Sequence, residues 1–260
     1  MSRPPLLELK HVTVMRGERA ALDDVSLTIG AGEHVAILGP NGCGKSTLIK
    51  TITRECYPLA RDESSMAISG RERWNVFELR NLLGIVSPDL LAQCSTDATG
   101  RDVVLSGFFS STRIFPHHQP QPDWIERAEA AMKRLAISHL ADRAVAHMSS
   151  GEAKRTLIAR ALVHEPHALL FDEPSNALDI AAQFQLRDTM RELARSGLAI
   201  LLVTHHVAEI LPEMERVVML QGGRILADGP KEIVLTESNL SRLFGVNVHL
   251  ERSDGFYQAW

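Results

Sequence analysis

One short segment, Gly39–Ser46, restricts the folds open to this chain more than any other part of its sequence. It reads Gly-Pro-Asn-Gly-Cys-Gly-Lys-Ser and fits the pattern G-x-x-x-x-G-K-[ST]. The apolar run Val35–Leu38 before it is typical of a buried strand, and residues 45–54 after it have a helical composition. Strand, loop and helix are the context that this pattern requires, so we expect a phosphate-binding loop here.

The residue types in this loop suit a nucleoside triphosphate with its metal ion. Glycines let backbone N–H groups turn toward the β- and γ-phosphates, and the start of the helix adds positive potential. Lys45 is expected to bridge phosphate oxygens, and the Ser46 hydroxyl to ligate Mg²⁺. A plain glycine-rich turn is the alternative, but it needs neither a lysine nor a serine at these positions. The predicted nucleotide-binding residues of the loop are Gly39, Pro40, Asn41, Gly42, Cys43, Gly44, Lys45, Ser46 and Thr47.

A second apolar run, Ala168–Phe171, ends in two acids, Asp172 and Glu173. Because α/β proteins bind ligands at the carboxyl ends of their strands, Asp172 is expected to coordinate Mg²⁺. Glu173 then acts as general base on the water that attacks the γ-phosphate, or orients that water. An acidic strand end is often only solvated, and the phosphate loop upstream is what favours the functional interpretation.

The order of elements predicts an α/β fold. Alternating residues predict a small β layer over residues 7–29, and the α/β alternation resumes after residue 150 with a helix 151–163, the strand 168–171, a helix 180–195 and a strand 199–203. Strands 217–220 and 224–227 and a hairpin at Asp254-Gly255 follow. Residues 89–150 look mostly helical, with Asp123 as N-cap of a helix from Trp124 and a second helical stretch over 138–146.

Composition excludes several classes of protein. With 260 residues, 45% hydrophobic and 23% charged, the chain can bury a core, and a net charge of −4 gives no bulk attraction for nucleic acid, so none is expected as a partner. No apolar run approaches the roughly 18 residues of a membrane span, and the N-terminus lacks the apolar core of a signal peptide. Three cysteines without a C-x-x-C pair fit the reducing cytoplasm.

The segment Met148–Glu152, which reads Met-Ser-Ser-Gly-Glu, resembles the LSGGQ signature of ATP-binding cassette (ABC) ATPases. The other motifs of that family follow in order. They are Asp172-Glu173-Pro174 as Walker B, Ser175–Asp179 as the D-loop, and Thr204-His205 as the switch histidine. The resemblance implies an α/β P-loop NTPase with a RecA-like core, an N-terminal antiparallel β subdomain and a helical insertion. One ABC ATPase domain would span 1–260, with the β layer and core in 1–88 and 151–260 and the helical subdomain in 89–150.

By the same resemblance, two copies pair head to tail and sandwich two ATP molecules. Each nucleotide then lies between one copy's phosphate loop and the other copy's Ser149, Gly151 and Glu152. The helix start that precedes Lys154 and Arg155 suits an anion in any case. N-capping by Ser149 or Ser150 is the alternative, and both uses can coexist.

By the resemblance, His205 is expected to contact the γ-phosphate. Arg16 occupies the place of the aromatic ring that stacks on adenine in this family. Tyr57 or a side chain of the partner copy could cover the adenine instead. Three further positions depart from the family pattern. Pro88 stands where the Q-loop glutamine is expected, with Gln93 as a possible substitute, and the signature has Ser150 and Glu152 in place of Gly and Gln.

These features predict an Mg²⁺-dependent ATPase that dimerises on ATP and drives a separately encoded integral membrane permease from the inner face of the cell membrane. Metal-chelate or cobalamin-type import is the cargo class suggested by the resemblance. A soluble ABC-type ATPase of DNA repair or translation is the alternative, which Pro88 keeps open. A small-molecule kinase with a P-loop is a weaker one, because it has no use for the signature or the D-loop.

Overall fold

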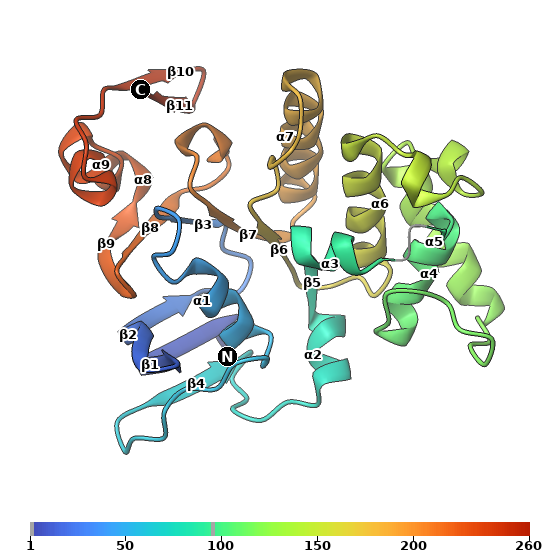
Figure 1. Ribbon diagram of the computed structural model, residues 1–260, viewed down its shortest axis with the longest axis horizontal. Coiled ribbons are helices and arrows are strands. Elements are labelled where there is room, and N and C mark those ends of the chain that lie inside the picture. The colour runs from blue at the N-terminus through green and yellow to red at the C-terminus, as the bar shows by residue number, and fades with distance from the viewer. Residues whose placement is uncertain (1–2, 95–96) are drawn as a thin grey trace. The chain divides into compact units, whose positions relative to one another are not determined.

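The computed structural model describes residues 3–94 and 97–260. The chain forms two compact units, one made of Met1–Val76 with Ala199–Trp260 and the other of Phe77–Leu198. Their helices and strands are labelled in Figure 1. In the residues that the structure describes, no helix is both long and apolar enough to cross a bilayer.

The first unit contains a three-stranded antiparallel sheet. Its strands are β1 (Leu7–Arg16), β2 (Arg19–Ile29) and β4 (Ser65–Ile68), in the order β2-β1-β4. Leu9 and Val12 of β1 are both buried although they are three residues apart, because the register shifts between them and His11 adopts φ 47°. The predicted antiparallel β layer is confirmed, and β4 is an additional strand.

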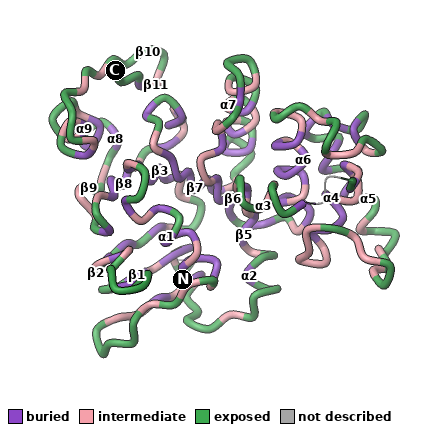
Figure 2. Tube along the Cα trace, viewed as in Figure 1, coloured by how far each residue is buried: buried purple, intermediate pink, exposed green. Residues whose placement is uncertain are grey.

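The same unit holds four further strands side by side. β7 (Ala199–Thr204), β3 (Val35–Leu38) and β8 (Arg216–Gln221) are parallel, and β9 (Arg224–Pro230) is antiparallel to β8. Every residue of β3 and β7 is buried, as Figure 2 shows in purple. Strands covered on both faces read as continuous apolar runs, which explains why these strands were predictable.

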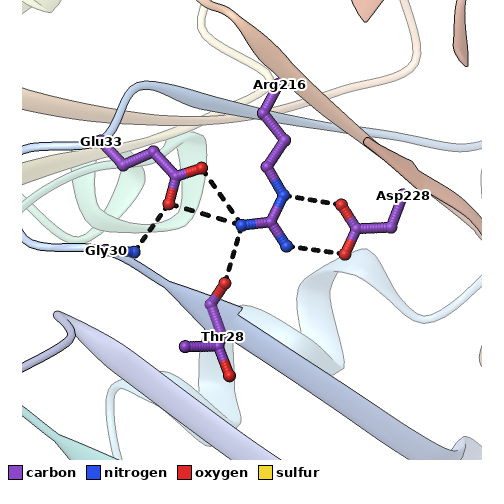
Figure 3. A network of polar contacts seen from close by, with 5 residues as sticks. All are labelled: Thr28, Gly30, Glu33, Arg216 and Asp228. Carbon is purple, nitrogen blue, oxygen red and sulfur yellow. Dashed lines mark hydrogen bonds and ion pairs between the residues drawn. The ribbon is translucent and has the colours of Figure 1, made fainter. Parts of the chain in front are cut away.

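Arg216, the first residue of β8, joins β8 and β9 to the end of β2 through hydrogen bonds and ion pairs. Figure 3 shows Arg216 donating from Nε and Nη2 to the two carboxylate oxygens of Asp228, at 2.7 Å each, and from Nη1 to the Thr28 carbonyl at 2.8 Å. Glu33 accepts from Nη1 at 3.1 Å and from the Gly30 N–H at 2.7 Å. These contacts raise the pKa of Arg216 above its ordinary value, chiefly through the hydrogen bonds to Asp228. Arg216 therefore links β8 and β9 to the end of β2.

The rest of the first unit consists of short helices and a hairpin. These are α1 (Lys45–Ile52), η4 (Val207–Glu209), α8 (Lys231–Val234), α9 (Glu237–Phe244), β10 (Leu250–Ser253) and β11 (Phe256–Ala259). The hairpin turns at Asp254 and Gly255, whose φ angles are 51° and 82°. The turn predicted from this Asp-Gly pair is confirmed.

The second unit pairs β5 (Leu83–Val86) with β6 (Ala168–Asp172) in parallel. Its helices are α2 (Val76–Leu82), α3 (Pro88–Gln93), α4 (Gly100–Ser106), η1 (Gly107–Phe109), α5 (Pro122–Arg134), η2 (Ser138–Leu140), η3 (Val145–His147), α6 (Ser150–Leu162) and α7 (Ile180–Arg195). Helices α4, α5 and α6 pack against one another. The predicted helices 151–163 and 180–195 are confirmed as α6 and α7.

Two local predictions in this unit are wrong. Helix α5 begins at Pro122 with Gln121 as an N-cap that makes no side-chain bond, so Asp123 lies inside the first turn. Proline fixes a helical φ and lacks an N–H, which makes it the better first residue. Residues 138–146 form 3-10 turns rather than a helix, because their carbonyls accept bonds from α4: Ala141 from Arg101 N–H at 2.9 Å and Arg143 from Gly100 N–H at 3.0 Å.

The compact units do not follow the proposed division at residues 89–150, since the second unit runs from residue 77 to 198. A helical subdomain with the bounds 89–150 therefore stays a prediction.

Candidate nucleotide site

Two glycines of the loop after β3, Gly39 and Gly44, are required by close packing. A Cβ on Gly39 would lie 2.3 Å from the Leu220 carbonyl oxygen, and a Cβ on Gly44 would lie 2.5 Å from the Ala21 carbonyl oxygen. Gly44 also has a φ of +114°. Real Cβ atoms do not approach backbone that closely. Gly39 N–H donates to the Thr204 carbonyl at 3.2 Å, which fixes the loop to the end of β7. The loop is thus a close-fitting backbone cradle that side chains would fill.

Lys45 occupies the centre of this cradle. Its side chain is buried, and Nζ donates to the carbonyls of Gly39 at 2.8 Å and Pro40 at 3.0 Å. The first helical bond of α1 runs from Leu48 N–H to the Gly44 carbonyl at 2.9 Å, so the N–H groups of residues 45–47 precede the helix's own ladder. An ammonium group and a helix start form a donor set that fits phosphate oxygens.

The other loop residues divide into an exposed and a buried set. Asn41, Gly42 and Ser46 are exposed, whereas Cys43 and Thr47 are buried. Cys43 Sγ lies 2.6 Å from the position that a Gly39 Cβ would take, and the Cys43 carbonyl accepts the Gly223 N–H at 2.8 Å. Ser46 is therefore accessible from solvent, whereas Cys43 packs against Gly39 of the loop.

His205 follows the strand that anchors the loop. Thr204, at the end of β7, is fully buried; its carbonyl accepts the Gly39 N–H and its hydroxyl accepts the His206 N–H at 2.9 Å. The half-buried His205 ring lies against the His206 ring with centroids 3.8 Å apart. The first unit thus brings His205 to the phosphate loop, through one shared backbone bond.

Arg16 lies at the exposed end of the β1–β2 hairpin, also in the first unit. Its Nη1 donates to Cys56 Sγ at 3.6 Å, beside Tyr57, which is 69% exposed. The two residues proposed for the adenine, Arg16 and Tyr57, therefore lie close together. Which of them a base contacts stays a prediction.

The acidic pair lies in the second unit, at the end of β6. Asp172 is the last strand residue, and Glu173 leaves the strand with φ 43°, a left-handed conformation. Glu173 Oε2 accepts from the Asn176 amide at 2.7 Å, and its carbonyl accepts the Asn176 N–H at 3.2 Å. Asn176 as the partner of this carboxylate was missed at the sequence level, since nothing in its spacing marks it.

The signature segment begins α6 with a capping box. Ser149 Oγ accepts the Glu152 N–H at 3.3 Å, and Glu152 Oε2 accepts the Ser149 N–H at 2.7 Å. This backbone hydrogen bond is the main reason that the pKa of Glu152 is lowered; Arg143 and His139, 3.6 and 3.9 Å from Oε1, add to it. N-capping by Ser149, the alternative interpretation, is confirmed, and its use toward a nucleotide stays a prediction.

The two basic residues near the start of α6 bond to the neighbouring turn and to helix α7. Lys154 is buried, and its Nζ donates to the carbonyls of Pro174 and Asn176, the latter at 2.7 Å. Arg155 donates to Gln185 Oε1 of α7 at 2.8 Å. Gly151 is half-exposed and lies against α7, where an added Cβ would be 3.2 Å from that of Ala182. Close packing of α6 on α7 explains the glycine here.

The position of the missing Q-loop glutamine is a helix start. Pro88 is the first residue of α3, and the Ser87 hydroxyl caps this helix by accepting the Leu90 N–H at 3.1 Å. Gln93 is the exposed last residue of the same helix. Its proposed role as a substitute stays a prediction.

Comparisons with known proteins agree with these motifs. The family model described as ABC transporter matches residues 22–176, which is more than half of the chain. The ABC transporter ATP-binding protein YlmA of Bacillus subtilis (strain 168), itself uncharacterized, is 30% identical over 250 residues, 94% of this chain and 93% of its own. The hemin import ATP-binding protein HmuV of Nocardia farcinica (strain IFM 10152) is 34% identical over 231 residues, 87% of this chain and 76% of its own.

A solved structure extends the agreement to the fold. The structure of cbiO1 from Clostridium perfringens, part of the ABC transporter complex cbiONQ, is similar with a TM-score of 0.76 and 27% identity, covering 92% of this chain and 94% of that one. The family match, the relatives and this fold coincide with a phosphate cradle and a capped signature helix in one chain. The chain therefore belongs to the ABC transporter family, as one of its ATP-binding, ATP-hydrolysing P-loop cassettes.

Proposed function

We propose that two copies of this chain bind two ATP molecules between them and use their hydrolysis to drive a membrane permease. The main support for this proposal is that one chain contains both parts of such a site. Its first unit provides the cradle around Lys45, and its second provides the signature helix capped at Ser149. A signature helix start that suits an anion supports the head-to-tail pairing.

In this proposal the chain's own residues divide the work. The loop amides and Lys45 bind the β- and γ-phosphates, while Ser149, Gly151 and Glu152 of the other copy approach the same nucleotide. Ser46 and Asp172 would hold Mg²⁺, which neutralises developing charge on the phosphate oxygens when bound. Glu173 orients or deprotonates the attacking water, and His205 contacts the γ-phosphate.

We propose that the permease imports a metal chelate. The relative HmuV of Nocardia farcinica is named as a hemin import protein, and cbiO1 is part of an ABC transporter complex. The chain would then act at the inner face of the cell membrane through its permease. Co-purification with an integral membrane protein tests this part of the proposal.

A soluble cassette ATPase without a permease is the second candidate. Pro88 favours it, because the position expected to carry a metal-contacting glutamine is instead the rigid start of α3. Failure to recover any membrane protein, together with full ATPase activity, would favour this second function.

The hydrolytic roles are tested by Glu173→Gln. The substitution keeps the shape and the phosphate cradle, so binding of a fluorescent ATP analogue should be unchanged, while kcat falls about 100-fold or more because the water loses its carboxylate. Glu251→Gln, at an exposed position of β10, is the matched control and should keep the parent rate. Chelation of Mg²⁺ should also stop turnover in the parent. Parent-like turnover by Glu173→Gln would overturn the role given to this carboxylate.

A further inference from the structure

The backbone at Glu173 is held in a conformation that it would not keep by itself. Its φ of 43° lies in the left-handed region, and Ala177, four residues later, has φ 63°. Residues with a Cβ rarely adopt this conformation, and it persists only where the surroundings fix it. Contacts around the turn 173–177 must therefore supply that restraint.

Part of the restraint comes from within the turn. The Asn176 side-chain amide donates to Glu173 Oε2 at 2.7 Å, and its backbone N–H donates to the Glu173 carbonyl at 3.2 Å. Leu178 N–H closes the next turn on the Ser175 carbonyl at 3.1 Å. The direction of the Glu173 carboxylate thus depends on where the backbone of Asn176 lies.

A further restraint comes from the signature helix. Lys154 of α6 is 7% exposed, and its Nζ donates to the carbonyls of Pro174 and Asn176, on either side of Ser175. A buried ammonium group needs such acceptors, because an unpaired buried charge is costly. The helix is itself fixed, by the Ser149 and Glu152 capping box and by Gly151 against α7.

We propose that Lys154 is a positioning residue for the reaction. It holds the turn 174–176 in place, so that the Asn176 amide aims the Glu173 carboxylate. This inference rests on the proposed function of Glu173 and deepens it, because it joins the signature helix to the hydrolytic carboxylate of the same chain. Lys154 touches neither the nucleotide nor the water in this account.

The chain offers a matched control for the lysine. Lys231 is also buried, at 4% exposure, and its Nζ also donates to two successive backbone carbonyls, Leu211 at 3.3 Å and Pro212 at 2.7 Å. Its turn contains no residue assigned to the reaction. Lys154→Met and Lys231→Met therefore remove the same kind of contact from a catalytic and a non-catalytic turn.

The test measures kcat, affinity for a fluorescent ATP analogue and thermal unfolding in both variants. Lys154→Met should lower kcat about tenfold to a hundredfold, since small displacements of a catalytic group have effects of this size, with affinity within about twofold of the parent. Lys231→Met should lose a similar amount of thermal stability and keep the parent kcat. An unchanged kcat in folded Lys154→Met would overturn the proposal, as would an equal kcat loss in both variants.

Asn176→Ala gives a second arm that does not remove a buried charge. It should lower kcat to a similar extent, and the double variant with Lys154→Met should lose little more, because both residues act through one path. Fully multiplicative losses would contradict a shared path. If Glu173→Gln itself turns over normally, the role proposed for Glu173 fails; if it is inactive while Lys154→Met is fully active, only the positioning role fails.

Discussion

Three buried lysines in this chain share one chemistry. Lys45, Lys154 and Lys231 each direct Nζ to two nearby backbone carbonyls. In each case one ammonium group, which has three N–H donors, bonds two carbonyls of the same turn. At Lys45 the turn is the glycine-rich loop itself, so the ammonium group shapes the loop in which we propose that the phosphates bind.

The residue at position 16 leads to a prediction about selectivity for the nucleotide base. Arg16, in the place of the family's aromatic ring, offers a smaller stacking face and a charge, so most of the binding free energy should come from the triphosphate. We expect GTP to compete with ATP to within about 1 kcal/mol, as measured by competition against a fluorescent analogue, and Arg16→Tyr to tighten ATP binding. A strong ATP preference that survives Arg16→Ala would show that the base is read elsewhere.

The sequence predicted the loop itself, because the order of strand, glycine-rich turn and helix around Lys45 is local. The close approach of Gly39 to Leu220 and of Gly44 to Ala21 could not be predicted, because these residues are far apart in the chain. The link from Lys154 to Asn176 could not be predicted, because it joins residues twenty-two apart through backbone carbonyls, which have the same chemistry at every position. The sequence suggested an outward, anion-facing role for the start of α6, and packing against the turn directs Lys154 inward instead.

Among the elements, the joint between β8, β9 and the end of β2 depends on Arg216. Its partners Asp228 and Glu33 have side chains only 28% and 30% exposed, so they would be left without a cation if it were removed. Arg216→Met should therefore cost about 2–3 kcal/mol in urea unfolding. Arg224→Met is the control, since Arg224 pairs with Asp23 in an exposed bridge, 66% and 36% exposed, worth about 0–1 kcal/mol. Equal costs would contradict the role given to Arg216.

The contact between β3 and β7 predicts a dependence of stability on pH. His34 Nδ1 accepts the Ile200 N–H at 3.2 Å, and burial lowers the pKa of His34 although Glu213 and Glu215 oppose the shift. The folded state thus binds fewer protons here than the unfolded state, so its stability is complete above the ordinary histidine pKa of about 6.5 and declines as the pH falls below it. His118 and His164, whose pKa values are also lowered by burial, contribute in the same direction.

A variant of His34 isolates its contribution to the loss of stability at low pH. His34→Asn keeps an acceptor near the position of Nδ1 without a titrating group, and His118 and His164 remain in both proteins. Urea unfolding at pH 7.5 and 5.5 should show a smaller loss of stability on acidification in the variant than in the parent. The same loss in both would show that His34 does not contribute.

Elements were predictable where their own residue pattern was strong, although the partners of β3 and β6 are distant in the chain. Helices α6 and α7 and strands β3, β6 and β7 agree with their predicted bounds to within one residue. The turns at 138–147 were not predictable, since their backbone pairs with α4 about forty residues earlier. Strand β4 was missed for the same reason, because its place is set by β1.

For the whole molecule, the two halves of the proposed site belong to different compact units of one chain. The phosphate loop and His205 lie in the first unit, and the signature helix and Glu173 lie in the second. The head-to-tail pairing was inferred from the motifs, and in the proposal a second copy brings its signature helix to each phosphate loop. The central claim is therefore that each site is composite.

A mixed dimer tests this claim most directly. Lys45→Ala disables the phosphate loop and Ser149→Arg blocks the signature, so each variant alone should be inactive. In a dimer of one copy of each, both lesions fall in one composite site and leave the other whole. ATPase activity should return when the two inactive variants are mixed and purified together through two different tags. Absence of any activity in such purified mixed dimers would contradict the composite site.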